Sequence, residues 1–148
     1  MKTSSVLTAL LIVVAASCTH NDKMPEIYSS SSYAIGGYDP VAYFTEAKPV
    51  KGSEEFSYQW KDANWIFSSK QNLDSFTANP EKFAPQYGGW CAYGCSKGHK
   101  ATTDPNAWTI VDGKLYLNHS LQVKEGWMKD QKQSIEEADK NWPGIKDK

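Results

Sequence analysis

Two cysteines and one histidine stand at intervals of four residues in the aromatic segment from Tyr87 to His99. Thiolate sulfur and neutral imidazole nitrogen are the ligands that copper(I) and zinc(II) prefer. In a helix, residues four positions apart lie on one face, one turn above each other. A helical segment would therefore direct Cys91, Cys95 and His99 the same way, and the sequence predicts a metal site made of these three side chains.

Several other interpretations of the same residues stay open. Gly94 and Gly98 each cost a helix about 1 kcal/mol relative to alanine, so His99 is expected just past the helix end, on a turn. Cys91 and Cys95 can equally be small buried apolar residues, or a redox couple that cycles between dithiol and disulfide. A permanent disulfide is disfavoured by helical geometry. A cysteine–histidine nucleophile lacks a recognisable set of oxyanion donors.

Two polar residues outside this segment also have a structural and a chemical interpretation. His119 lies just after residues 114–117, which are predicted below to be a strand. It is either a fourth metal ligand or, as we expect, a capping or surface residue. Asp39 precedes Pro40, and an aspartate in that place is typical of an Asx-type turn. The chain shows no Ser-His-Asp pattern, glycine-rich phosphate loop or two-histidine zinc-protease motif, so we expect a binding protein rather than an enzyme.

The N-terminal residues have the pattern of a secretory signal peptide. Lys2 supplies a positive charge, an apolar run extends from Val6 to Ala16, and small residues precede Cys18. The run is too short for a transmembrane helix, which needs about 20 residues. A cysteine directly after small residues resembles a bacterial lipobox, which implies removal of residues 1–17 and acylation of Cys18. We therefore expect a membrane-anchored lipoprotein of the bacterial cell envelope, facing the periplasm or the outside; the alternative is a secreted protein with a free thiol.

Composition argues against a nucleic-acid partner. The chain has 16 basic and 17 acidic residues, a net charge of −1, and every basic residue is a lysine. It therefore lacks arginine, which reads guanine and phosphate through paired hydrogen bonds. Six tryptophans and eight tyrosines can build the core of one small domain. We expect residues 18–32 to form a flexible tether and residues 33–145 to form the domain, and no internal repeat is evident.

Periodicity predicts two β-hairpins in this domain. Apolar and polar residues alternate over 56–60, a turn follows, and residues 65–67 return as the partner strand. The second hairpin joins strands at 108–111 and 114–117 through Asp112-Gly113, which is a strong hairpin signal. We expect both hairpins to lie in one antiparallel sheet.

A helix is predicted after each hairpin. Ser68 or Ser69 can cap a helix that ends before Pro80. Apolar residues recur at helical spacing from Ser120 to Trp142, and Pro143-Gly144 is expected to stop that helix. Packing these helices on the antiparallel sheet makes a small single α+β domain.

Four motifs in a fixed order resemble those of YHS-domain proteins: Gly37–Phe44, Trp65–Ser69, Asn79–Ala92 and Asp112–Asn118. The resemblance implies a small α+β fold, an envelope location and an association with metal handling, as in related short modules of copper-transporting ATPases. Cys91 stands at the cysteine of the family motif Tyr-Gly-Gly-x-Cys-Ala, whereas Cys95 and His99 depart from the family pattern. Ser68 stands near the place where the short modules carry paired cysteines.

The sequence therefore predicts a lipid-anchored envelope protein that binds a soft metal ion through Cys91, Cys95 and His99. Copper(I) is the expected ion and zinc is the alternative. We expect a binding or trafficking module whose partner is an envelope metal-trafficking protein. The other functions left open are a protein-interaction domain with structural cysteines and a thiol redox protein.

Overall fold

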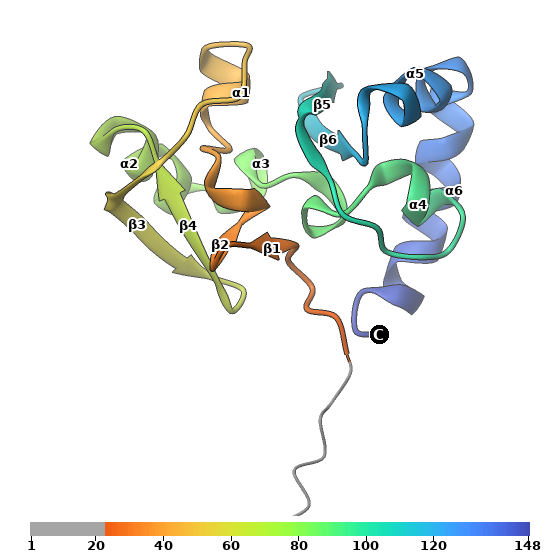
Figure 1. Cartoon of the computed structure of the whole chain (residues 1–148), viewed down its shortest axis with the longest axis horizontal. Coiled ribbons are helices and arrows are strands. Elements are labelled where there is room, and N and C mark those ends of the chain that lie inside the picture. Colours follow the sequence, from red (N-terminus) through yellow and green to blue (C-terminus); the bar gives the residue numbers. More distant parts are fainter. Residues whose placement is uncertain (1–22) are drawn as a thin grey trace, which may run out of the picture.

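The structure is a computed structural model, and it describes residues 23–148 (Figure 1). The predicted signal peptide and Cys18 lie outside these residues. Within the described part of the chain, no helix combines the length and the apolar run needed to cross a membrane. Helices pack beside two-stranded antiparallel sheets, which confirms the predicted α+β class.

The first half of the fold is drawn on the left of Figure 1 and the second half on the right. The first half contains β1 Ser29–Ser30, β2 Tyr33–Ala34, η1 Ile35–Gly37, α1 Ala42–Thr45, β3 Ser53–Trp60, β4 Ala63–Phe67, α2 Lys70–Ala78 and α3 Pro80–Phe83. The second half contains η2 Gln86–Gly89, α4 Ala92–Ser96, β5 Asp104–Val111, β6 Lys114–Asn118, α5 Leu121–Lys129 and α6 Gln131–Ile145.

Both predicted hairpins and both predicted helix starts are confirmed. β3 pairs with β4, and β5 pairs with β6. Ser69 begins α2 by accepting a hydrogen bond from the Asn72 N–H, and Ser120 begins α5 by accepting one from the Val123 N–H. The prediction of one shared sheet is wrong, because each hairpin forms its own two-stranded sheet. Each sheet contacts the helix that follows it, α2 or α5.

The core consists of two apolar clusters that meet at β6. Leu115 and Leu117 lie in the first cluster with Phe67, whereas Tyr116 lies in the second cluster with Trp127. Successive residues of a strand face opposite sides, so both faces of β6 are buried and the strand joins the two clusters. Full burial of one large apolar side chain, such as Leu115, stabilises the fold by about 1.5–3 kcal/mol.

A structural repeat relates the two halves. β5, β6 and α5 begin and end 51 residues after β3, β4 and α2, respectively. The registers repeat as well: Ser53 pairs with Phe67 where Asp104 pairs with Asn118, and each sheet then shifts register at the same place. The expectation of no repeat is therefore wrong at the level of the backbone.

The turn before each hairpin also repeats. Three consecutive residues have positive φ in both halves, at 45°, 68° and 77° in Ile35-Gly36-Gly37 and at 58°, 61° and 84° in Tyr87-Gly88-Gly89. Glycine adopts this left-handed conformation without strain. The glycine pair is what the two turns share in sequence. Because the turns share only this short motif, the repeat is recognised in the backbone structure and not in the amino-acid sequence.

Residues 24–32, which the sequence assigns to a flexible tether, lie against the domain. Ile27 is 2% exposed. The Tyr28 N–H donates to the Gly88 carbonyl at 2.8 Å, and the Tyr28 carbonyl accepts from the Ile35 N–H at 2.8 Å. Burial of Ile27 and packing of Tyr28 on Trp90 thus hold the segment, and the ordered part of the domain begins earlier than predicted.

The predicted C-terminal helix is two helices, α5 and α6, separated by Asp130 in a non-helical conformation. The buried residues Trp127 and Ala138 are eleven positions apart, which is about three full turns, so periodicity continues across the break without revealing it. α6 also passes Pro143, where a stop was expected, and ends at Ile145. A proline this close to the end removes only one of the backbone hydrogen bonds.

Candidate functional site

Cys91 begins helix α4 instead of lying inside it. Its backbone is non-helical (φ −55°, ψ 118°), and its sulfur accepts a hydrogen bond from the Gly94 N–H at 3.4 Å, as the residue that caps a helix does. The thiol donates to Asn118 Oδ1 at 3.5 Å, at the end of β6. Cys91 is only 2% exposed. This thiol is therefore a buried, hydrogen-bonded part of the junction between α4 and β6.

Cys95 lies inside α4, fully buried in the second apolar cluster. Burial raises the pKa of the Cys95 thiol to about 12, and the nearby Cys91 adds to the increase. The thiolate is the form that binds metals, so neutral pH disfavours the reactive form of this side chain. Both cysteines are free thiols.

His99 lies beyond the end of α4, as the two glycines predict. Gly98 has a φ of 85°, and the His99 N–H donates back to the Gly94 carbonyl at 3.1 Å. The side chain of His99 is exposed, whereas those of Cys91 and Cys95 are buried. The three expected ligands therefore share one short segment but differ in their environment.

These residues do not fit a preformed copper or zinc site. Across residues 23–148, no three cysteine, histidine or carboxylate side chains lie together in a way that could hold a metal ion. The predicted common face requires both cysteines to be inside the helix, and Cys91 is its capping residue. His119 does not complete the set: its Nδ1 lies 3.0 Å from the Thr102 carbonyl oxygen on the surface, in keeping with the expected surface role.

Asp39 is the polar centre of the first half. It is fully buried, and its Oδ1 accepts hydrogen bonds from the N–H groups of Val41 and Ala42, which is the predicted Asx-type turn. Its Oδ2 accepts from the N–H and hydroxyl of Ser68 and from the Asn72 side chain. The serine that stands near the expected cysteine position thus belongs to a hydrogen-bond network.

Lys100 is a buried lysine that sequence reasoning missed, and it is 8% exposed. Its Nζ donates to the carbonyls of Met24 and Pro25 at 3.0 Å each and of Lys146 at 2.6 Å. The ring centroids of Trp90 and Trp142 lie 5.5 and 5.8 Å, respectively, from the same nitrogen. Burial lowers the pKa of this ammonium group. Lys100 therefore joins the first and last described segments of the chain.

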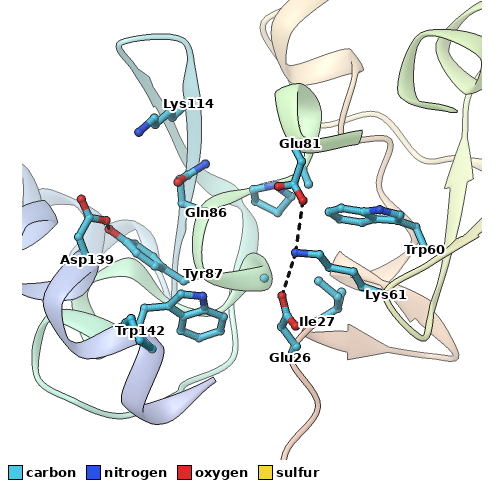
Figure 2. A pocket seen from close by; sticks show the side chains of 14 residues that line it. Glu26, Ile27, Trp60, Lys61, Glu81, Gln86, Tyr87, Lys114, Asp139 and Trp142 are labelled. Carbon is cyan, nitrogen blue, oxygen red and sulfur yellow. Dashed lines mark hydrogen bonds and ion pairs between the residues drawn. The ribbon is translucent and has the colours of Figure 1, made fainter. Parts of the chain in front are cut away.

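A cleft of about 370 Å³ lies between the two halves, and we call it the inter-repeat cleft (Figure 2). Residues of both halves line this cleft. Those labelled in Figure 2 are Glu26, Ile27, Trp60, Lys61 and Glu81 on the side of the first half, and Gln86, Tyr87, Lys114, Asp139 and Trp142 on the side of the second half. Small-molecule sites typically have volumes of about 300–1,000 Å³. The cleft is thus large enough for a small ligand.

Lys61 reaches into the inter-repeat cleft and joins two carboxylates. Its Nζ lies 3.0 Å from Glu26 Oε1 and 3.4 Å from Glu81 Oε1, as the dashed lines in Figure 2 show. Burial by itself would lower the pKa of Lys61, but the two carboxylates outweigh this effect and hold that pKa above its ordinary value. Lys61 therefore stays charged and lies beside both acids at one wall.

Tyr87 and Asp139 form the polar part of the opposite wall. The Tyr87 hydroxyl donates to Asp139 Oδ1 at 2.8 Å. Burial and this hydrogen bond raise the pKa of Tyr87 well above its ordinary value. The tyrosine ring packs edge-on against Trp142, with 5.9 Å between the ring centroids. Tyr87 therefore stays neutral and holds Asp139 in place.

Sequence reasoning also missed the inter-repeat cleft. Glu26 stands in the segment expected to be a tether, Lys61 in a hairpin turn and Asp139 on a helix surface. These residues share no motif, because they come together only where the two repeats meet. The structural repeat itself is the signal that would have pointed to an interface of this kind.

Residues 41–87 match the family model of the YHS domain. This match confirms the predicted resemblance to YHS-domain proteins over this segment. The match begins just before α1 and covers most of the first repeat. YHS domains as a class are associated with metal binding. Neither a curated protein nor a solved structure matches the chain.

Proposed function

We propose that this chain is a non-catalytic binding module of the bacterial cell envelope in which Cys91 and Cys95 are structural residues. The observation that carries the proposal is the burial of both thiols, with Cys91 hydrogen-bonded to Gly94 and Asn118. A metal ligand must be a thiolate, and a redox thiol must also be accessible to its reaction partner. In the metal-free protein, burial raises the pKa of Cys95 to about 12, which disfavours its thiolate at neutral pH.

The decisive experiment is a thiol-accessibility measurement on the chain with Cys18→Ser, which leaves Cys91 and Cys95 as its thiols. We expect neither to react with a chromogenic thiol reagent until urea unfolds the protein. Adding Lys97→Cys, at an exposed position in the same segment, supplies a positive control that reacts at once. Rapid reaction of the two native thiols in the folded state would contradict the proposal.

The proposal includes a lipid anchor at Cys18 and an envelope location. Its support is the positive residue, apolar run and small residues that precede this cysteine. Metabolic labelling with a radioactive fatty acid should mark the wild type, and Cys18→Ser should lose both the label and membrane association. A label that survives the substitution would place the acyl group elsewhere.

Copper(I) binding is the second candidate function. One observation favours it: Cys91 and Cys95 belong to one short segment of a chain that resembles YHS-domain proteins, and the Cys95 N–H donates to the Cys91 carbonyl at 2.9 Å. Soft thiolate ligands select copper(I), and zinc is the alternative ion. In this version the two cysteines supply thiolates, His99 supplies an imidazole, and an envelope metal-trafficking protein is the partner.

A competitive copper(I) titration against a chromogenic chelator separates the two functions. Under the first proposal, the wild type with its thiols reduced does not compete, and Cys91→Ser with Cys95→Ser behaves identically. One equivalent of copper held at sub-nanomolar affinity by the wild type and lost in the double variant would establish the second function. Repeating the titration with zinc tests the alternative ion.

A further inference from the structure

We propose that one end of the domain, around Met24, docks on the surface of a bilayer that contains anionic phospholipids. The residues that meet at this end, which we call the membrane face, are Lys23, Met24, Lys146, Asp147 and Lys148. The proposal rests on the proposed lipid anchor at Cys18, to which it adds an orientation of the domain and a class of lipid. Two features support it: the short connection between the anchor and the domain, and the charges of the face.

The chain is fixed to the domain from Met24 onward. The Met24 N–H donates to the Lys148 carbonyl at 3.1 Å, and the Met24 carbonyl accepts from Lys100 Nζ at 3.0 Å. Figure 1 shows the start of the described chain beside the end marked C. Because the segment expected to be a long tether lies against the domain, only residues 19–23 separate Cys18 from this fixed point.

This connection is too short for the opposite end of the domain to face the bilayer. Fully extended, the chain from Cys18 to Met24 spans at most about 20 Å. A compact domain of this length is about 35 Å across. Turning the opposite end to the bilayer would require Met24 to lie farther from the lipid than the chain can reach. An anchor at Cys18 therefore keeps the membrane face close to the bilayer.

The membrane face is basic, although the net charge of the whole chain is −1. Three ammonium groups stand on it, those of Lys23, Lys146 and Lys148. Asp147 is the one acidic member of the face, and its carboxylate lies 4.0 Å from Lys146 Nζ. Glu26 lies beside the face, but it is already paired with Lys61 at 3.0 Å. Positive charge is thus in excess where the anchor holds the domain, and an anionic surface attracts each such lysine by about fivefold in affinity.

Met24 adds an apolar side chain among these charges. The side chain belongs to a residue that is 43% exposed, although the backbone N–H and carbonyl of the same residue are both hydrogen-bonded to the domain. Apolar side chains flanked by lysines are typical of surfaces that lie at the boundary between lipid headgroups and acyl chains. The face therefore offers ammonium groups to lipid phosphates and one apolar side chain to this boundary.

Acetylation of lysines, read by mass spectrometry, tests the orientation. The lipidated chain is reconstituted into vesicles of phosphatidylcholine alone and of equal parts of phosphatidylcholine and phosphatidylglycerol. Lys23, Lys146 and Lys148 should react about fivefold more slowly on the anionic vesicles, and high salt should remove the difference. Lys70 and Lys132 are exposed controls that should not change; about 20 Å of helix α6 separates Lys132 from Lys146. Equal rates on the two vesicles, or stronger protection of the controls, would overturn the proposal.

Two triple variants separate the charge of the face from the charge of the chain. One variant combines Lys23→Gln, Lys146→Gln and Lys148→Gln, and the matched control combines Lys70→Gln, Lys129→Gln and Lys132→Gln at exposed positions elsewhere. The measurement is oxidation of Met24 by chloramine-T, with Met128, which is 51% exposed, as the reference in the same chain.

Anionic vesicles should slow oxidation of Met24 relative to Met128 in the wild type and in the control variant. The face variant should lose this protection, because its ammonium groups no longer attract the lipid phosphates. Protection that survives in the face variant, or that is lost equally in the control, would overturn the assignment of these three lysines.

Fatty-acid labelling of the same preparations distinguishes a failure of this inference from a failure of the proposed function. A label on Cys18 without protection of the membrane face overturns the orientation and leaves the proposed anchor intact. Absence of the label overturns the anchor and, with it, the orientation. The thiol and copper measurements concern Cys91 and Cys95 alone, and their outcome leaves the membrane face unaffected.

Discussion

Asp39 and Cys91 occupy the same place in the two repeats. Each follows its left-handed turn by two residues, and each side chain accepts a hydrogen bond from the first turn of a short helix, from Ala42 N–H or from Gly94 N–H. Each side chain also bonds to the end of a hairpin, Asp39 at Ser68 after β4 and Cys91 at the end of β6. In both repeats this side chain therefore links the left-handed turn to the end of a strand through hydrogen bonds, with a carboxylate at Asp39 and a thiol at Cys91.

We expect Asp39→Asn to destabilise the fold by about 2 kcal/mol or more. The Oδ2 atom accepts hydrogen bonds from the Ser68 N–H, the Ser68 hydroxyl and the Asn72 side-chain amide. In Asp39→Asn, an NH2 group in the place of Oδ2 would face these donors with another donor. Urea unfolding measures the loss. Asp74→Asn is the control, because its exposed ion pair with Lys70 should contribute only about 0.5 kcal/mol. Equal effects of the two substitutions would contradict the role of Asp39.

Gly88→Ala should cost more than Gly36→Ala, although the two glycines are equivalent in the repeat. Both have a left-handed backbone, at φ 61° and 68°, and that strain costs alanine about 1–2 kcal/mol at either site. A Cβ at Gly88 would lie 2.0 Å from the Glu26 carbonyl oxygen, whereas nothing lies within 4 Å at Gly36.

The extra cost at Gly88 should appear as displacement of the segment around Tyr28, whose N–H bonds to the Gly88 carbonyl. Hydrogen exchange of the Tyr28 amide should accelerate in Gly88→Ala and stay unchanged in Gly36→Ala. Equal unfolding free energies and equal exchange rates in the two variants would show that the segment tolerates the added methyl group.

Stability should fall as the pH rises from about 9 toward 12 because of Cys95. Its folded pKa of about 12 lies above the value of 9.0 expected for the unfolded chain, so the folded state keeps a proton that the unfolded state releases. The stabilisation is complete below pH 9 and is lost by at most about 1.4 kcal/mol per pH unit across this window. Urea unfolding at several pH values should show a shallower decline in Cys95→Ala. Parallel curves for the two proteins would contradict the burial effect.

Lys100→Met should destabilise the fold by about 3 kcal/mol, because four carbonyl oxygens lose a charged donor. The amide of Met24, which donates to the Lys148 carbonyl, should exchange faster in the variant. Lys97→Met is the control, since this lysine is exposed and lies 3.9 Å from its acidic neighbour Glu137. A loss no larger than that of the control would show that the ammonium group is not needed at this junction.

Local signals in the sequence predict the local structure well. The Asp112-Gly113 turn, the serines that begin α2 and α5, and the Asx-type turn at Asp39 all depend on residues close together in the chain. The YHS-domain match covers the motifs at Trp65–Ser69 and around Pro80. Each of these features depends on residues within a few positions of one another, so it can be predicted from the sequence.

Relations between distant segments could not be predicted in this way. Spacing places Cys91 and Cys95 on one helical face, but Cys91 is the capping residue, and a spacing argument cannot locate a helix start to one residue. Ile27 lies in a stretch rich in serine, and Lys100 finds its partners at both ends of the described chain. Tertiary contacts decide these outcomes, and they also form the inter-repeat cleft.

The hydrogen bond between the Met24 N–H and the Lys148 carbonyl, at 3.1 Å, brings the two ends of the described chain together beside Lys100. Ends that meet can be joined by a short linker, and the chain can then be reopened at an exposed turn such as Asp112-Gly113. Such a circular permutant would begin inside the second repeat and reach the first repeat afterwards. A folded permutant would show that the order in which the two repeats are synthesised does not decide how they enclose the cleft.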